Sequence, residues 1–501
     1  MKRMLSLVLA LIMVLSMASM LAQAEDANKP AKISIMVDGT LVTEPNGRAE
    51  FEARWEELTG IDLEIIQPDH SSYYEVLSQR VATGNLPDAF LLGSEYYSSY
   101  AAAGLLWEMT DAWENSATHN SGRFFGDYAI EGLKMDGKLY GIPMAKGNGC
   151  VTYIKKAWLD AVNLDAPTTY EEYLNVLVAF TTEDPDGNGE NDTFGVTAAG
   201  FIGPEAPWVN YFPEFYQDAT PSFYKDEDGV WHDGFVEPEM QAALERMTEA
   251  YALGTIDPET LTNTTANCRE KFYDDKFGVF TYWAGQWASN LKNNLEIHGK
   301  DGELVALEPI EEVGAYIDRV SGCWCISAAC ENPEGVYDWF IDNMLDGGDV
   351  QFLWTYGVEG VHWSRKAETL YAGTSKEVTY AEGQFHFLDN RETPGSQYKK
   401  SMLDPALVFA TYKEGFEAPT DVAPENAYSA NLFNTHSKSA QLVPGTEAKN
   451  EYDGDLLALK KELVANIIMG KISYEEAMEQ FEAEGGNVMS QAIVDSLNAI
   501  G

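Results

Sequence analysis

The sequence is poor in cysteine and in basic residues, and it lacks the short signatures of several enzyme classes. Its five cysteines are too few and too unevenly spaced for a disulfide framework, and Cys323-x-Cys325 does not have metal-finger spacing. There are 33 Lys and Arg residues against 80 Asp and Glu residues, and the formal net charge of −47 excludes nucleic acid as a partner. No His-Glu-x-x-His, Gly-x-Ser-x-Gly or phosphate-loop motif is present. We therefore expect buried thiols, with one disulfide among Cys323, Cys325 and Cys330 left open, and no chemistry of those motif classes.

The N-terminus has the layout of a cleavable secretory signal. Lys2 and Arg3 precede an apolar run from Met4 to Leu21, and Ala22-Gln23-Ala24 follows it. A membrane anchor is the alternative, but the Ala-x-Ala end and the polar residues 25–30 favour cleavage after residue 24. No cysteine stands near the cut, which argues against a lipoprotein anchor. We expect an exported protein that is extracellular or associated with the cell surface, or periplasmic in a Gram-negative cell.

Hydrophobic patterning beyond the signal predicts an α/β fold. Short β-branched runs at 33–37, 61–66, 89–92 and 278–282 predict strands, and residues 51–58, 73–81 and 97–103 predict helices that end near glycines. Alternation of strand and helix implies a mostly parallel sheet. Capping boxes at 168–171 and 473–476 predict two further helix starts. There is no internal repeat and no low-complexity tract.

Residues 184–195 have the oxygen spacing of a calcium loop. Asp184, Asp186, Asn188 and Asp192 offer side-chain oxygens around two glycines, and Glu190 offers its backbone carbonyl. Calcium takes six to eight oxygens at about 2.3–2.6 Å, and alternate residues of a tight turn point inward together. The match to an EF-hand is incomplete, because the twelfth position is Gly195, where an EF-hand has a bidentate Glu. The alternative interpretation of the loop is an Asx-rich surface turn. Because the loop lies in a connection rather than at a strand end, we expect a structural calcium ion away from the ligand.

Seven short segments follow one another in a characteristic order from residue 33 to the C-terminus. They are residues 51–60, 82–88, 104–111, 137–143, the 184–195 loop, 330–334 and 356–363. Their order resembles that of the family 1 extracellular solute-binding proteins of bacterial ABC importers, particularly the long oligosaccharide-binding branch. The 184–192 loop is also similar to the calcium loop of alginate-oligosaccharide-binding relatives. The absent lipobox cysteine leaves the mode of tethering open, and Thr193 stands where relatives offer an acidic calcium ligand.

The resemblance implies two α/β lobes joined by a hinge, with the ligand in an interlobe cleft that closes around it. By analogy, residues 31–145 plus 320–400 form one lobe and residues 146–319 plus 401–501 form the other. The resemblance also implies that the chain captures a carbohydrate, an oligosaccharide in this branch, and delivers it to ABC permease subunits. We expect a monomer that is not an enzyme.

Aromatic and polar side chains follow the predicted strands, where ligands gather in open α/β sheets. The candidate ligand-binding residues are Asp38, Tyr96, Trp283, Trp287, Tyr356, Glu359, His362 and Trp363. Sugars present an apolar CH face and a ring of hydroxyls, so flat rings beside carboxylates suit them. Each residue also has a simpler interpretation: tryptophans pack cores, Asp38 precedes a glycine as in a turn, and a histidine such as His362 is more often a satisfied structural residue.

Two other function classes remain open on the sequence. A secreted glycoside hydrolase would use two carboxylates about 5–10 Å apart, but no pair is singled out by a motif. A calcium-dependent surface adhesin would lack a closing cleft. A receptor differs from both because its ligand stabilises it without being consumed. The sequence does not decide whether the sugar is neutral or acidic.

Overall fold

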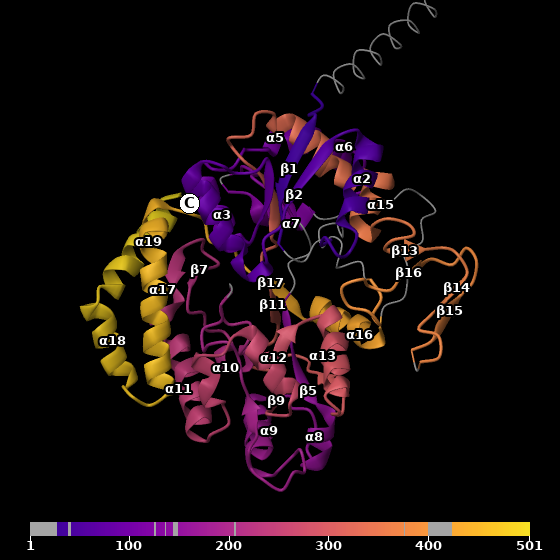
Figure 1. Cartoon of the computed structure of the whole chain (residues 1–501). Coiled ribbons are helices and arrows are strands. Elements are labelled where there is room, and N and C mark those ends of the chain that lie inside the picture. Colours follow the sequence, from indigo (N-terminus) through magenta and orange to yellow (C-terminus); the bar gives the residue numbers. More distant parts are fainter. Residues whose placement is uncertain are drawn as a thin grey trace, which may run out of the picture. The chain divides into compact units, whose positions relative to one another are not determined.

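We describe a computed structural model of the chain (Figure 1), which covers residues 28–38, 42–124, 127–135, 137–143, 149–204, 207–374, 376–398 and 423–500. The chain divides into two compact units. Unit 1 comprises Met1–Lys146 and Gly322–Pro419, and unit 2 comprises Gly147–Ser321 and Thr420–Gly501. The predicted signal peptide, residues 1–24, lies outside the described residues. No helix in the described part of the chain combines the length and apolar character that a membrane-spanning helix needs.

Unit 1 is built on a five-stranded sheet with the order β2-β1-β3-β12-β4. Its strands are β1 (Lys32–Met36), β2 (Asp62–Ile66), β3 (Ala89–Leu92), β4 (Ile142–Pro143) and β12 (Cys323–Ile326). β1 pairs in parallel with both β2 and β3, while β12 is antiparallel to β3 and β4. The parallel part follows from the strand and helix alternation of the sequence, because parallel neighbours need a crossover connection.

Helices of unit 1 bury an aromatic cluster. They are α2 (Arg48–Thr59), α3 (Tyr73–Thr83), α4 (Ser94–Ala102), α5 (Thr110–Asn115), α6 (Ala117–Asn120), α7 (Asp127–Leu133), α14 (Pro333–Val336) and α15 (Asp349–Tyr356), with the short turns η1 (His70–Ser72), η4 (Tyr337–Asp342) and η5 (Asn343–Leu345). Trp354 of α15 meets Phe51 of α2 edge-on, with ring centres 4.9 Å apart. Such T-shaped pairs fix helix positions as well as burying area.

Unit 1 also carries two small antiparallel pairs. β13 (Trp363–Ser364) pairs with β16 (His386–Phe387), and β14 (Glu368–Leu370) pairs with β15 (Val378–Tyr380).

Unit 2 has a four-stranded sheet with the order β10-β5-β9-β6. The strands are β5 (Cys150–Lys155), β6 (Phe194–Val196), β9 (Phe277–Trp283) and β10 (Leu304–Ala306). β9 is parallel to β6 and antiparallel to β5. Gly278 in β9 is required by close packing, since a Cβ there would lie 2.3 Å from the ring of Phe180.

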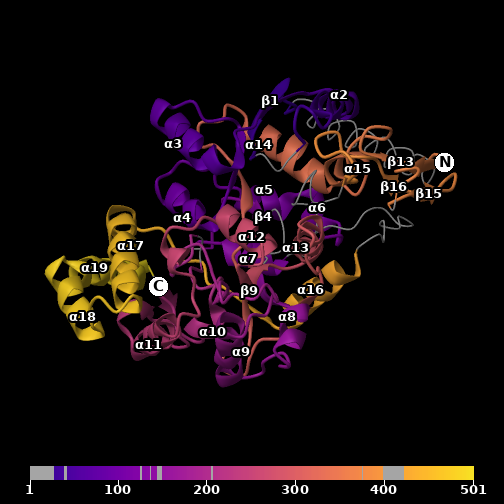
Figure 2. The same ribbon diagram turned by 60° about the horizontal axis from the view of Figure 1, so that its bottom comes forward.

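Unit 2 is rich in helices, and Figures 1 and 2 show α17, α18 and α19 packed side by side next to α11. The helices are α8 (Lys156–Ala161), α9 (Tyr170–Thr182), α10 (Pro213–Tyr216), α11 (Pro238–Ala252), α12 (Thr265–Tyr273), α13 (Gln286–Ile297), α16 (Pro424–Thr435), α17 (Glu447–Ile468), α18 (Tyr474–Ala483) and α19 (Gly486–Ile500). Shorter elements are the turns η2 (Gly234–Val236) and η3 (Pro258–Leu261), the antiparallel pair β7 (Phe223–Lys225) and β8 (Trp231–Asp233), and the parallel pair β11 (Tyr316–Asp318) and β17 (Ser437–Ser439).

The N-termini of α18 and α9 are where the sequence predicted capping boxes. The box at Ser473 is confirmed, because its hydroxyl accepts from the Glu476 amide and the Glu476 carboxylate accepts from the Ser473 amide. The box predicted at 168–171 is one residue early, since Thr169 is the N-cap and bonds the amide of Glu172. Glu172 reaches back to the amide and hydroxyl of Thr168, which explains the shift.

Candidate functional site

Unit 1 brings polar and aromatic side chains together at the carboxyl ends of its three parallel strands. Asp38 follows β1, His70 follows β2 and Tyr96 follows β3, and these strand ends lie side by side in the sheet. The Asp38 carboxylate lies 2.8 Å from Nδ1 of His70. The His70 side chain is 75% exposed and that of Asp38 is 22% exposed, so this pair is accessible.

Tyr96 forms part of a tyrosine stack, which we call the unit 1 platform. Its ring lies parallel to that of Tyr74, with centres 3.9 Å apart, and Tyr100 meets it edge-on. The Tyr74 hydroxyl accepts a hydrogen bond from the Gly93 amide at 2.7 Å, which ties the ring to the end of β3. Sequence reasoning missed His70 and Tyr74. They follow β2, so applying the strand-end rule to that strand as well would have found them.

The four candidates in the loop after α15 have a different environment. His362 has no exposed surface, its Nε2 lies 2.6 Å from the Asn46 carbonyl oxygen, and its Nδ1 accepts from the Val358 amide. Burial lowers the pKa of His362 to about 4, so the ring is neutral at pH 7. A buried neutral ring with both nitrogens bonded holds the loop in place and offers a ligand nothing.

Tyr356 and Trp363 are also enclosed, with 2% and 8% of their surface exposed. The indole N–H of Trp363 donates to the Gly357 carbonyl, and the ring stacks on Phe385 with centres 5.1 Å apart. Glu359 is exposed beside them. The structure therefore groups Tyr356 and Trp363 with the core of unit 1, and Glu359 is the exposed one of the four candidates.

Unit 2 presents two tryptophans at the carboxyl end of β9, and we call them the unit 2 platform. Trp283 ends the strand, and Trp287 lies in the first turn of α13 after a turn at Gly285, whose φ is +73°. Both rings are half-buried. Tyr211 meets Trp283 edge-on, and Tyr282 meets Trp287 edge-on at 4.8 Å between ring centres.

Each platform tryptophan has an arginine on its face. The guanidinium carbon of Arg319 lies 4.3 Å from the centre of the Trp283 ring, and that of Arg269 lies 5.2 Å from the centre of the Trp287 ring. Nη1 of Arg269 also donates to the Tyr282 hydroxyl at 2.6 Å. No sequence signal pairs these residues, because they come from different elements.

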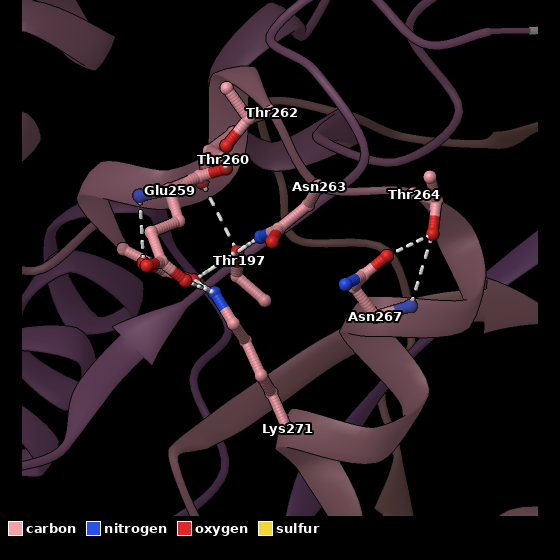
Figure 3. A network of polar contacts seen from close by, with 9 residues as sticks. Thr197, Glu259, Thr260, Thr262, Asn263, Thr264, Asn267 and Lys271 are labelled. Carbon is pink, nitrogen blue, oxygen red and sulfur yellow. Dashed lines mark hydrogen bonds and ion pairs between the residues drawn. The ribbon is translucent and has the colours of Figure 1, made fainter.

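A polar network lies at the carboxyl end of β6, the strand next to β9 in the unit 2 sheet. Thr197 follows β6, and Figure 3 shows Asn263 and Lys271 pointing toward it. The carboxylate of Asp257 accepts from all three, with Lys271 Nζ at 2.7 Å. Although burial alone would raise it, these hydrogen bonds hold the pKa of Asp257 below its ordinary value. The polar groups of this network are bonded to one another, which makes the network a support for the turn rather than a site.

The predicted calcium loop is folded around the side chain of Asn188. The Asp184 carboxylate accepts from the amides of Asn188 and Gly189, and the Asn188 NH₂ group donates to Asp186 and Asp192, each at 2.9 Å. Burial and the neighbouring carboxylates raise the pKa of Asp186. Gly187 and Gly189 have φ of +68° and +88°, values that favour glycine.

These donors fit a hard cation in kind, because three carboxylates and an amide oxygen are the ligands that calcium prefers. Their side chains are not arranged as a metal site, because no group of three or more His, Cys, Asp and Glu side chains among the described residues is placed to hold a metal ion. Lys276 also contacts the loop, with its Nζ 2.8 Å from an Asp192 carboxylate oxygen.

One buried acid has the raised pKa that often marks a catalytic group. Burial raises the pKa of Glu214 to about 7, and its Oε1 accepts from the Thr152 hydroxyl at 2.5 Å. Only 1% of Glu214 is exposed, so no substrate reaches it. All five cysteines are free thiols, and Sγ of Cys323 and Sγ of Cys325 lie 3.5 Å apart without a bond.

Comparisons with known proteins agree on one family. Residues 43–346 match the family described as "Bacterial extracellular solute-binding protein". The chain is 25% identical to the polygalacturonan/rhamnogalacturonan-binding protein YtcQ of Bacillus subtilis over 472 residues, which cover 89% of this chain and 87% of the relative.

Solved structures of the same fold cover nearly the whole chain. The alginate-binding protein AlgQ2 without calcium ion is 18% identical, with a TM-score of 0.63 and coverage of 94% of this chain and 98% of the other. An EF-hand mutant of the Streptococcus pneumoniae ABC-transporter substrate-binding protein FusA, in complex with fructo-nystose, is 17% identical, with a TM-score of 0.59 and coverage of 94% and 100%. The predicted family and the two-lobe α/β fold class are confirmed. This chain belongs to the bacterial extracellular solute-binding protein family.

Proposed function

We propose that this protein is an extracellular receptor that captures an oligosaccharide and delivers it to the permease subunits of an ABC importer. The observation that carries the proposal is the pair of aromatic platforms, each at the carboxyl end of a central strand of its own unit. Flat rings stack on the CH faces of sugars, and the accessible Asp38 accepts hydrogen bonds from hydroxyls. The relatives that are named for polygalacturonan and rhamnogalacturonan, for alginate and for a complex with fructo-nystose support a carbohydrate ligand.

Unit 1 and unit 2 are the two lobes in this proposal, corresponding to residues 31–145 plus 320–400 and residues 146–319 plus 401–501. The proposed ligand residues are Asp38, Tyr96, Trp283 and Trp287, with His70 and Tyr74 added. We give His362, Tyr356 and Trp363 structural roles because of their burial, and Glu359 remains the one candidate of its loop.

Titration calorimetry with a panel of plant and bacterial oligosaccharides tests the proposal. We expect one class of glycan to bind with micromolar or tighter affinity, and Trp283→Ala and Tyr96→Ala each to weaken it. Arg54→Gln, which removes an exposed charge that pairs with Glu57, is the matched control and leaves affinity unchanged. The absence of binding across the panel by correctly folded protein would refute the receptor.

We also propose that the protein performs no reaction on its ligand. The relatives are substrate-binding proteins, and the one buried acid with a raised pKa is closed off from solvent. After calorimetry, the same samples are analysed for new reducing ends. Release of reducing ends would favour the glycoside hydrolase. Calcium-dependent aggregation of cells, without binding of any glycan, would favour the adhesin.

A structural calcium ion in the 184–192 loop is part of the proposal. Asp184, Asp186, Asn188 and Asp192 would hold it through side chains and Glu190 through its backbone carbonyl, while the ion would cross-link the segment after α9. The Asn188 amide must turn so that its oxygen, rather than its NH₂ group, faces the carboxylates. Relatives named for calcium and for an EF-hand support this assignment.

Export is proposed from residues 1–24 and from the extracellular family. N-terminal sequencing of protein recovered from outside the cytoplasm should start at Glu25, and gel filtration should give a monomer. A chain that retains its first 24 residues in the membrane would contradict the cleavable signal.

A further inference from the structure

Arg269 contacts no carboxylate among the described residues, although several other cations of unit 2 do. The chain has 80 acidic residues for 33 Lys and Arg residues, so cations near a strand end are readily neutralised. Lys271, two residues further along α12, lies 2.7 Å from Asp257 and 2.6 Å from Glu259. Lys276 lies 2.8 Å from Asp192. Arg269 has no carboxylate oxygen within 4.0 Å among the described residues.

The side chain of Arg269 is nonetheless held in one orientation. Its guanidinium lies over the rings of Trp287 and Tyr282, 5.2 Å and 5.8 Å from their centres, and one N–H donates to the Tyr282 hydroxyl. Figure 1 places α12 and α13 beside β9, and these elements are in contact. A guanidinium carries five N–H donors in a rigid fork, so most of them remain for another acceptor. Arg269 is partly exposed.

Binding of a neutral sugar does not require a fixed guanidinium group. Hydroxyl groups are bound well by carboxylates and amides, which the acidic chain has in excess. A fixed guanidinium fork instead matches a planar carboxylate, to which it can make two parallel charge-assisted hydrogen bonds. Because the net charge of −47 repels anions in general, an anionic ligand needs a local cation of this kind.

The second tryptophan repeats the pattern. Arg319 lies over the Trp283 ring at 4.3 Å from its centre, so both rings of the unit 2 platform carry a guanidinium. A pyranose ring with a carboxyl group at its edge could stack on an indole while its carboxylate meets the arginine beside that indole.

We infer that the ligand is an acidic oligosaccharide built of uronic acids, and that Arg269 binds one of its carboxylates beside Trp287. This inference rests on the proposed receptor function and narrows its ligand class.

Calorimetry with matched glycans tests it. The probes are trigalacturonate and trimannuronate, each with its carboxyl-reduced neutral counterpart, titrated into the full chain without its signal. We expect at least one uronate to bind at least tenfold more tightly than its neutral counterpart, with affinity falling as salt rises. Arg269→Gln should weaken that uronate at least tenfold and leave the neutral sugar unchanged, whereas Arg54→Gln should change neither.

Circular dichroism confirms that each variant is folded, and Arg269→Lys provides a second variant that keeps the charge and loses the fork. Lys should recover part of the uronate affinity. Equal binding of the neutral and acidic sugars, or Arg269→Gln binding the uronate like the wild type, would overturn the inference and leave the receptor intact. Failure of all four probes, together with tight binding of an unrelated neutral glycan from the panel, would also overturn it. Failure of every glycan would refute the receptor itself.

Discussion

Glu214 should make unit 2 less stable as the pH rises from acidic to neutral. The side chain lies under the sheet, its Oε1 accepts from the Thr152 hydroxyl, and its Oε2 has no hydrogen-bond partner among the described residues. Burial raises its pKa from the ordinary value of 4.5 to about 7 in the folded state. The unfolded chain releases this proton near pH 4.5, while the folded protein keeps it until about pH 7. The stabilisation is therefore full below pH 4.5 and is lost as the pH rises through 7.

The size of this loss follows from the pKa difference. One pKa unit corresponds to 1.36 kcal/mol, so the shift of Glu214 is worth about 3 kcal/mol between pH 4.5 and pH 7.5. Glu214→Gln keeps an acceptor for the Thr152 hydroxyl and cannot ionise. Relative to the wild type, the free energy of unfolding of the variant should therefore rise by about 3 kcal/mol over that pH range.

Urea unfolding followed by tryptophan fluorescence at pH 4.5, 6 and 7.5 measures the difference. Other titrating groups cancel when variant and wild type are compared at each pH. Glu171→Gln, at an exposed position of α9, is the matched control, and its difference from the wild type should stay constant. A difference for Glu214→Gln that is equally flat would refute the raised pKa.

Three other predictions concern the platforms, the calcium loop and His362. Trp283→Ala should weaken oligosaccharide binding at least tenfold, about 1.4 kcal/mol, in calorimetry, and unchanged affinity would remove that ring from the site. In excess calcium, Asp184→Ala should lower the melting temperature. Glu190→Ala should leave the melting temperature unchanged, because it keeps the backbone carbonyl. The affinity for the ligand should be near normal in both variants. Melting curves that are identical in calcium and in chelator would eliminate the ion. His362→Ala should cost about 3 kcal/mol in the free energy of unfolding, since it leaves the Val358 amide and the Asn46 carbonyl unpaired, and a neutral outcome would contradict its structural role.

The four predicted strands were readable from the sequence because each is next to a helix and is bounded by turn residues. The predicted strand at 89–92 matches β3, and the one at 278–282 is β9 shortened by a residue at each end. The helix start at Ser473 was also readable, because a capping box depends on two residues that are only three positions apart in the sequence.

The candidate site was readable only in part. The strand-end rule led to the prediction of Asp38 and Trp283, because it depends on local sequence and sheet direction alone. The structure has Asp38 just after β1 and Trp283 at the end of β9. Burial of the loop around His362 was not readable, since it depends on how Asn46, 316 residues earlier in the chain, meets the ring. Arg269 was missed for the same reason: its contact with Trp287 joins two helices, and neither helix signals it.

Strand β9 separates the two proposed binding functions of unit 2. Lys276, next to Asp192 of the calcium loop, immediately precedes the strand, and its carbonyl accepts from the Phe194 amide beyond that loop. Trp283 ends the strand seven residues later, about 20 Å away at the rise of an extended chain. A metal bound at the first end, as proposed, would therefore stabilise the entry to the strand without touching the rings at the other end. This distance is the physical reason why loss of calcium should lower stability and leave affinity for the sugar nearly intact.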